Sequence, residues 1–222
     1  MKNYVTVTPI TENTPKLSIK TTRFATWETI RDMETLPIGS EVEIKLKDGT
    51  QAVFQLAATD VYGGHKAFVA KDCILDEAPM NHKWTNDGGW VESDMRNRTM
   101  KKLLELLPDE LREIIVPRQI RQNIHDKKVG SEDLIWIPSY TEVVGPNGWG
   151  ARADVDDVHF PLFDSERARV KQDRAGKETT WWWLRSPNTG GATYFYSITA
   201  SGSSNYANSA NYSCGVAFGF LI

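Results

Sequence analysis

The clearest alternation of hydrophobic and polar positions lies in the first third of the chain. Residues 41–46 alternate charged and apolar side chains. Residues 52–56 form a second β-prone segment after an Asp48-Gly49 pair. Strict alternation places every second side chain on one face of a strand, and Asp-Gly favours a tight hairpin turn. The pattern therefore predicts a β-hairpin, followed by a third strand over residues 67–70.

The segment before this hairpin has no regular alternation. Residues 1–36 are rich in Thr, and Pro9 and Pro15 interrupt short β-prone stretches. Since proline cannot donate to a strand ladder, we expect an extended arm or edge strand that leads into a short helix near residues 27–33. We interpret residues 1–36 as an N-terminal arm or appendage.

The middle of the chain predicts helices and then irregular structure. Apolar residues at helical spacing follow Ser93 and stop at Pro108, and a second helix is predicted over residues 110–116. The Lys and Arg residues between positions 96 and 128 are interleaved with Glu and Asp, which is typical of a solvated helical face. Residues 134–137 predict a strand, and residues 145–176 an irregular functional or docking loop.

The last third returns to β-structure. Strands are predicted over residues 180–184, 194–199 and 216–222. The last has small residues on one face, where we expect another layer, such as the indoles of Trp181 and Trp183, to pack closely. Residues 201–213 are small and polar without apolar alternation, which predicts a display surface or disorder.

The composition of this last part points to binding. No charged residue occurs from Ser186 to Ile222, although a quarter of the whole chain is charged. Gly, Ser, Asn and Tyr dominate there, as they do in antibody paratopes, where Tyr supplies rigid contact area and the others adaptable hydrogen bonds. The candidate ligand-binding residues are Tyr194, Tyr196, Ser203, Asn205, Tyr206, Asn208, Asn211 and Tyr212.

Bulk properties exclude several other classes. A net charge of -3 provides no basic field for a phosphate backbone, so we expect no nucleic-acid partner. The chain has neither the apolar segment of a secretory signal near its start nor an apolar run of membrane-spanning length. We therefore expect a soluble protein with no signal peptide and no membrane insertion.

Four motifs carry a resemblance to a known family. They are Trp90-x-x-Ser93-x-x-Arg96-Asn97, the segment DLIWIPSYTEV over residues 133–143, Trp182-Trp183-Leu184-Arg185-Ser186-Pro187, and Gly215-Val216-x-Phe218-Gly219-Phe220. Taken in this order they resemble a family of gut bacteria and their phages that is similar to C-type-lectin-like proteins, is related to the formylglycine-generating-enzyme fold, and includes variable proteins of diversity-generating retroelements. Where many relatives have Gly-Val-Arg-Pro, this chain has Gly215-Val216-Ala217-Phe218.

The resemblance implies a fold and a function. The fold is α+β, a C-type-lectin-like domain over residues 37–222 with antiparallel strands, two helices and long irregular loops. The function is non-enzymatic ligand binding by a phage- or prophage-encoded display protein, virion-associated or cytoplasmic before assembly. Its partners would be a protein or glycan on a target cell surface, together with virion subunits.

Retroelement mutagenesis randomises adenines, so Asn codons of the type AAY never become Lys, Glu, Gln, Met or Trp. None of these five residues occurs from Asn188 to Ile222. This favours a candidate variable region at about residues 188–213. The alternative is a loop naturally rich in Asn, Ser and Gly, because these residues favour turns.

Candidate chemistry is sparse. A formylglycine-generating-type enzyme needs two closely spaced reactive cysteines that bind copper, whereas Cys73 and Cys214 lie far apart in the sequence and pair only if the fold brings them together. The four histidines lack metal-ligand spacing, and Asp154, Asp156 and Asp157 are typical of a solvated loop more than of a cation site. We expect no catalytic residue, metal or cofactor. An invariant phage structural protein and, less favoured, a formylglycine-generating-type enzyme remain the alternatives.

The tryptophans divide into two groups. We assign Trp136, Trp182 and Trp183 to packing, because large aromatic side chains are more often core than ligand platform. Trp149 lies between two glycines and is a candidate for the rim of a site.

Overall fold

The computed structural model describes residues 5–8 and 23–222 and has an α+β fold. Its largest sheet has the strand order β16-β5-β4-β3-β1-β2. The strands are β1 (Val5–Thr8), β2 (Arg23–Ala25), β3 (Glu41–Lys45), β4 (Gln51–Val61), β5 (His65–Ala70) and β16 (Gly219–Leu221). The predicted β3–β4 hairpin and the strand after it are confirmed, with Gly49 at a φ of 89° in the turn.

The second sheet has the order β14-β13-β12-β15-β6. It consists of β6 (Leu75–Ala78), β12 (Trp182–Pro187), β13 (Tyr194–Ile198), β14 (Tyr206–Ser209) and β15 (Cys214–Val216). β12 and β15 run parallel and the other neighbours are antiparallel. Of the two expectations for residues 201–213, a display surface or disorder, disorder is wrong for β14, which is a paired edge strand.

The predicted single strand over residues 216–222 is also wrong, because the chain crosses there from the second sheet to the first. The two parts are β15 and β16, and each contains a glycine packed against a neighbour. A Cβ on Gly215 would lie 2.5 Å from the Cys73 sulfur, and one on Gly219 would lie 2.6 Å from the Phe68 carbonyl oxygen. The predicted close approach is confirmed, although the atoms that approach these glycines are not indole rings.

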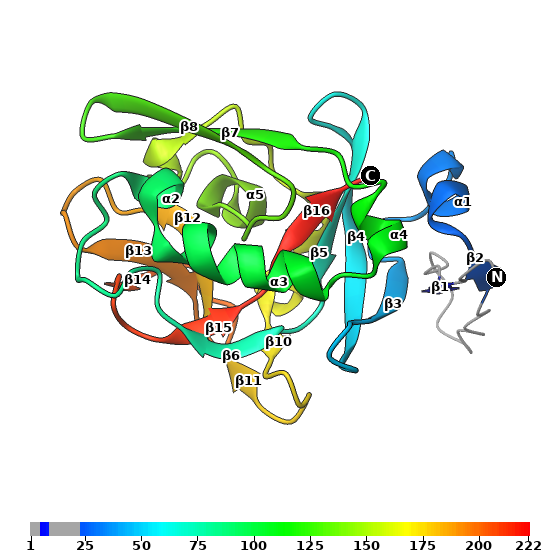
Figure 1. Cartoon of the computed structure of the whole chain (residues 1–222). Coiled ribbons are helices and arrows are strands. Elements are labelled where there is room, and N and C mark those ends of the chain that lie inside the picture. The colour runs from blue at the N-terminus through cyan, green and yellow to red at the C-terminus, as the bar shows by residue number, and fades with distance from the viewer. Residues whose placement is uncertain (1–4, 9–22) are drawn as a thin grey trace.

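Helices cross the front of the molecule in Figure 1. The predicted helix after Ser93 is a π-helical turn, η1 (Met95–Met100), that continues as α3 (Lys101–Leu106). The second predicted helix is shorter than expected and forms α4 (Asp109–Arg112). Two further helices, α2 (Gly89–Glu92) and α5 (Tyr140–Val144), were not predicted, although Ser139 and Glu142 form a capping box at the start of α5.

A hairpin of β7 (Arg118–Ile124) and β8 (Lys127–Asp133) forms a third sheet with β9 (Asp154–Val155). The interpretation of this basic segment as a helical face is therefore wrong beyond α4. The inward positions of β7 include Arg118 and Gln122, so the buried face is not uniformly apolar. The predicted strand over residues 134–137 is reduced to a bridge between Trp136 and Gly219.

The segment over residues 145–176 is mostly irregular, as expected. It contains the short 3-10 helices η2 (Trp149–Ala153), η3 (Pro161–Phe163) and η4 (Arg167–Arg169). It also contains β10 (Lys171–Gln172), which pairs with β11 (Thr179–Thr180). None of the helices in the described residues is long and apolar enough to cross a membrane.

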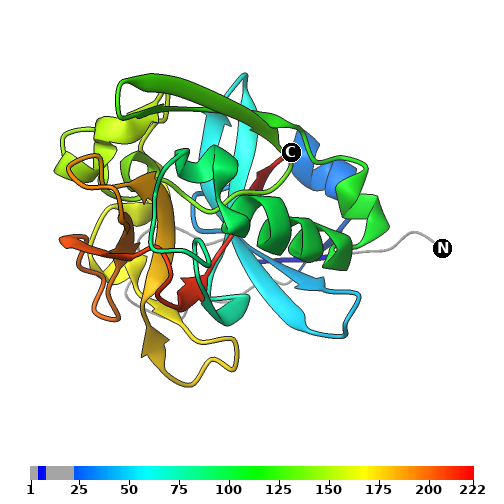
Figure 2. The ribbon, with the colours of Figure 1, turned by 60° about the vertical axis from the view of Figure 1, so that its left-hand side comes forward.

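One hydrophobic core extends from Trp27 to Ile222. Trp136, Trp182 and Trp183 are fully buried in it, which confirms their assignment to packing. The predicted short helix is α1 (Trp27–Asp32), and its Trp27 ring meets Phe220 edge-on at 6.0 Å. The end of the proposed appendage thus shares the core, while α1 and the β13–β14 region lie at opposite ends of the molecule in both ribbon views (Figures 1 and 2).

Candidate functional site

The β13–β14 pair divides the predicted ligand-binding residues between two faces of the sheet. Tyr196 lies opposite Ala207, and Phe195 lies opposite Asn208. Because side chains alternate along a strand, Tyr194 and Tyr196 share one face, while Tyr206 and Asn208 share the other. The predicted residues therefore do not form a single surface.

The face that carries Tyr196 is hollowed into a groove of about 140 Å³, which we call the aromatic groove. Its lining residues are Tyr140, Trp149, Asn188, Tyr196, Ser204, Asn205 and Ala207. The groove contains two of the predicted ligand-binding residues, Tyr196 and Asn205, and the predicted rim residue Trp149. Tyr140 was missed, since its sequence context indicates only a helix start.

Glycines on both sides of Trp149 build one wall of the groove. A Cβ on Gly148 or on Gly150 would overlap the Tyr140 ring, so only glycine lets the chain pass directly over that ring. Trp149 is thereby turned outward and is 73% exposed. The Tyr140 ring in turn meets the Tyr196 ring edge-on at a centroid distance of 5.1 Å. The Tyr140 and Tyr196 rings are thus packed in place, whereas the Trp149 indole projects into solvent.

Hydrogen bonds of Asp154 connect this wall of the groove to α5 and β12. Its carboxylate accepts hydrogen bonds from the Thr141 backbone N–H at 3.1 Å and hydroxyl at 2.9 Å, and from the Ser186 hydroxyl at 2.6 Å. The Ser186 oxygen also accepts the Tyr140 backbone N–H at 2.8 Å. Burial, together with the charge of Asp157, raises the pKa of Asp154 to about 7. The expectation that Asp154 and Asp157 lie in a solvated loop is wrong, because the Asp157 side chain is buried and the half-buried Asp154 is held by these hydrogen bonds; only Asp156 is exposed.

The polar groups of the groove are neutral, and most of them have no hydrogen-bond partner among the described residues. The hydroxyls of Tyr140, Tyr196 and Ser204 and the side-chain amide of Asn205 have no hydrogen-bond partner among the described residues. No charged residue lines the groove. Binding sites for small ligands combine aromatic walls with a few polar groups of this kind. The groove is therefore the best candidate site among the hollows of the described surface.

On the opposite face the predicted residues serve the fold. The Asn208 amide donates to the Ser197 hydroxyl at 2.9 Å and lies 3.7 Å from the Cys214 sulfur. The Tyr206 ring meets Trp181 edge-on at 5.2 Å. Asn208 is thus a structural residue, while Tyr206 is half packed and half exposed.

Of the other predicted residues, Tyr194 begins β13, and Ser203, Asn211 and Tyr212 lie in the turns on either side of β14. Tyr194 and Tyr212 have exposed rings, and the Asn211 side chain accepts a hydrogen bond from the Ser209 hydroxyl at 2.7 Å. The Ser203 backbone N–H donates to the Thr199 hydroxyl at 3.0 Å. These four residues do not line the aromatic groove.

A loop from outside the tail shapes the turn between β12 and β13. The buried Asn86 amide nitrogen donates to the carbonyl oxygens of Asn188, Gly191 and Tyr194 at 3.0, 2.9 and 2.8 Å. The same loop presents Trp84, which is 71% exposed. Trp84 is therefore an exposed tryptophan that lies outside the aromatic groove.

A buried ion network includes Glu142 of α5, the helix that also carries Tyr140, and sequence reasoning missed it. Arg185 donates to Glu142 at 2.6 Å and to Asp157 at 2.5 Å, and Arg118 pairs with the same two carboxylates. Although burial alone would raise it, the two arginines lower the pKa of Glu142 to about 2. The Arg118 guanidinium also lies 3.7 Å from the centre of the Tyr62 ring. This network joins β7, α5 and β12, so we assign it to the scaffold.

The buried lysine and the two thiols also belong to the scaffold. Lys171 donates to the Ala70 carbonyl at 2.5 Å and lies 4.9 Å from the centre of the Trp182 ring, and burial lowers its pKa to about 8. Cys73 and Cys214 are both free and buried, so they do not pair, and burial raises the pKa of each to about 12. Within the part of the chain that the structure describes, no three His, Cys, Asp or Glu residues are grouped so as to hold a metal ion.

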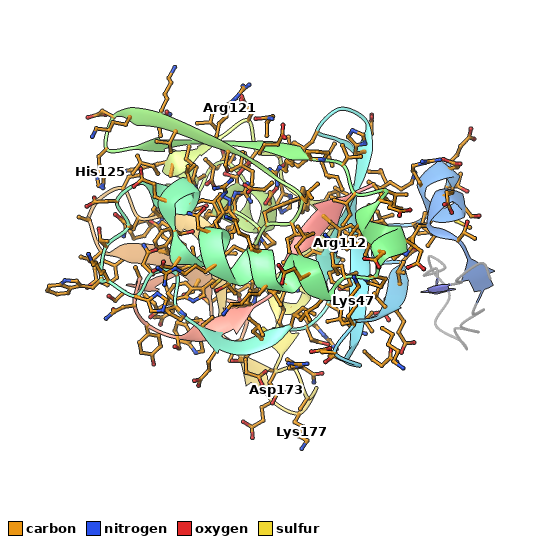
Figure 3. The ribbon with its side chains drawn as sticks, in the orientation of Figure 1. Lys47, Arg112, Arg121, His125, Asp173 and Lys177 are labelled. Atoms are coloured by element: carbon orange, nitrogen blue, oxygen red, sulfur yellow. The ribbon has the colours of Figure 1, made fainter. Side chains whose placement is uncertain are left out.

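The side chains labelled in Figure 3 come from other parts of the molecule. Arg121 and His125 belong to the β7–β8 hairpin and its turn, and Asp173 and Lys177 to the loop between β10 and β11.

The fold and the site together define an α+β protein with a small, neutral, aromatic groove. A family model, DUF6273, a domain of unknown function, matches residues 64–222, and the chain belongs to this family. No curated protein matches the chain. No solved structure matches it either.

Proposed function

We propose that this protein is a non-enzymatic binding protein that recognises a protein or glycan target through the aromatic groove and the adjoining tail. The observation that carries the proposal is a set of neutral polar groups without hydrogen-bond partners beside the packed rings of Tyr140 and Tyr196. A site whose rings are already fixed loses little conformational entropy on binding. The two buried thiols support a role without cysteine chemistry.

The proposal includes a C-type-lectin-like arrangement and a variable tail over residues 188–213. It is supported by the outward placement of Asn205, Tyr206, Asn211 and Tyr212, which are all exposed. Changes at exposed positions usually alter stability by no more than about 0.5 kcal/mol. A scaffold of this kind tolerates diversification at these four positions, whereas Asn208 is constrained by its bonds to Ser197 and Cys214.

Library screening tests the binding function. The purified chain is screened against a glycan array and a random peptide display library, alongside Asn205→Arg and Asn211→Arg. Both asparagines are exposed, but only Asn205 lines the groove. We expect at least one ligand that Asn205→Arg abolishes and Asn211→Arg retains. Ligands that are unaffected by Asn205→Arg, or no ligand in either library, would contradict a binding role for the groove.

Sequencing tests the diversification. The gene's neighbourhood and its 3′ end are read across a population of the host, and we expect a reverse transcriptase and a near-duplicate repeat that differs at adenines. Substitutions should fall on codons such as those of Asn205 and Asn211 and spare that of Asn208. An invariant tail without a repeat would favour a fixed phage structural protein instead.

A further inference from the structure

We infer that the aromatic groove binds one ring of a neutral sugar, stacked on Trp149 and hydrogen-bonded by Tyr140, Tyr196, Ser204 and Asn205. The inference rests on the proposed binding function and names its ligand class. It is carried by the size, the charge and the hydrogen-bonding groups of the groove.

The size suits a single ring. Sites for drug-sized ligands enclose roughly 300–1,000 Å³, whereas this groove encloses about 140 Å³. Its open side is bordered by the exposed indole of Trp149. The C–H face of a pyranose ring is apolar and flat enough to lie against such an indole, while its hydroxyls point sideways.

The charge excludes most other small ligands. A phosphate, carboxylate or ammonium group in the groove would lose water without gaining an opposite charge, and that loss is costly. Burial and the neighbouring Tyr140 raise the pKa of Tyr196, and the charge of Arg152 offsets this in part. Arg152 is exposed and does not line the groove.

The hydrogen-bonding groups match those of a sugar. The hydroxyls of Tyr140, Tyr196 and Ser204 can each donate and accept, and the Asn205 amide does both with separate atoms. Sugar hydroxyls also donate and accept at the same oxygen, so every one of these groups can be satisfied. The arrangement favours a polyhydroxylated ring over an apolar side chain, which would leave them unpaired.

The two walls of the groove come from different parts of the chain. Tyr140 and Trp149 precede the proposed variable region, whereas Tyr196, Ser204 and Asn205 lie within it. The aromatic wall therefore sets the ligand class, and the tail wall sets the choice among neutral sugars.

Titration calorimetry on the whole chain tests the inference. The probes are the methyl glycosides of glucose, galactose, mannose and N-acetylglucosamine, with N-acetylneuraminic acid and galacturonic acid as charged counterparts. We expect at least one neutral glycoside to bind with a Kd below about 50 mM. Neither acid should bind more tightly.

Trp149→Ala and Trp84→Ala form a matched pair, because the two indoles are 73% and 71% exposed and only Trp149 lines the groove. Trp149→Ala should weaken binding about tenfold or more, whereas Trp84→Ala should not change it. Thermal melts check that both variants fold. Arg152→Ala should leave the neutral affinity unchanged.

The outcomes separate this inference from the proposed function. No neutral glycoside binding up to about 50 mM, tighter binding of an acid, or equal losses in both tryptophan variants would overturn the sugar assignment. If a library peptide still binds and Asn205→Arg abolishes that binding, the binding function stands while the sugar inference fails.

Discussion

Replacing Arg185 with Met removes a guanidinium group that neutralises two buried carboxylates. Arg185 is fully buried and donates to Glu142, to Asp157 and to the Ile137 carbonyl oxygen at 3.0 Å. After the change, Glu142 and Asp157 share Arg118 alone, and one negative charge is left without compensation. Removing one partner of a buried ion pair costs about 3 to 5 kcal/mol of unfolding free energy.

For a chain of this length, each kcal/mol lowers Tm by about 2 to 4 °C, so Arg185→Met should lower Tm by about 6 to 20 °C. Thermal melts followed by circular dichroism and urea titrations measure this. The control is Arg121→Met, which breaks an exposed pair with Asp156 at 3.0 Å, where the side chains are 65% and 67% exposed. The control should cost no more than about 1 kcal/mol.

The loss should also depend on pH. Without Arg185, the pKa values of Glu142 and Asp157 in the folded protein rise above their unfolded values near 4. Between these two pKa values the folded variant holds protons that the unfolded chain has released, so its stability falls as the pH rises. The destabilisation should therefore be larger at pH 8 than at pH 5. A loss below about 1 kcal/mol, or one equal to that of Arg121→Met, would refute the assignment of Arg185 to the buried network.

Three further predictions concern other buried groups. Because the pKa of Asp154 in the folded protein is raised from 3.8 to about 7, the stabilisation by its protonated form is present below pH 3.8 and is lost as the pH rises to about 7. Asp154→Asn cannot ionise, so it should become more stable relative to wild type between pH 5 and 8, by at most about 4 kcal/mol. Urea titrations measure this difference. Trp182→Ala should lower the free energy of unfolding by about 3 to 5 kcal/mol because the ring is fully buried, whereas the exposed Tyr212→Ala should change it by no more than about 0.5 kcal/mol. Thermal melts that reverse this order would contradict the division into scaffold and display surface. Cys73 and Cys214 should resist thiol labelling at pH 8 in the native state and react fully after denaturation, since burial raises the pKa of each to about 12; fast native labelling would instead support an enzyme with a reactive thiol.

The sequence predicted the elements whose local pattern agrees with their final environment. The β3–β4 hairpin has strict alternation and an Asp-Gly turn, and it forms as expected. The β7–β8 hairpin was missed because Arg118 and Gln122 occupy inward positions, and because its turn uses His125 and Asp126 at positive φ instead of glycine. In that hairpin long-range partners, which the local pattern does not reveal, satisfy the buried polar groups.

Only part of the candidate site could be predicted, again because the local pattern does not show long-range partners. Trp149 between two glycines indicated a rim, and Tyr196 and Asn205 were named from composition, and all three line the groove. Composition does not show which side of the sheet a residue faces, so Asn208 in β14 was grouped with Asn205, which precedes that strand. The burial of Arg185 and Asp157 was also out of reach, because charged residues are usually exposed unless the fold pairs them.

Asn86 has a consequence for anyone who would move the tail to another protein. Its side chain holds three carbonyl oxygens of the turn between β12 and β13, yet it lies about a hundred positions before that turn in the sequence. A synthetic peptide of residues 188–213, or a graft of that segment onto a different framework, would lack this support. The recognition surface is therefore portable only as a whole domain, and engineering should vary side chains in place.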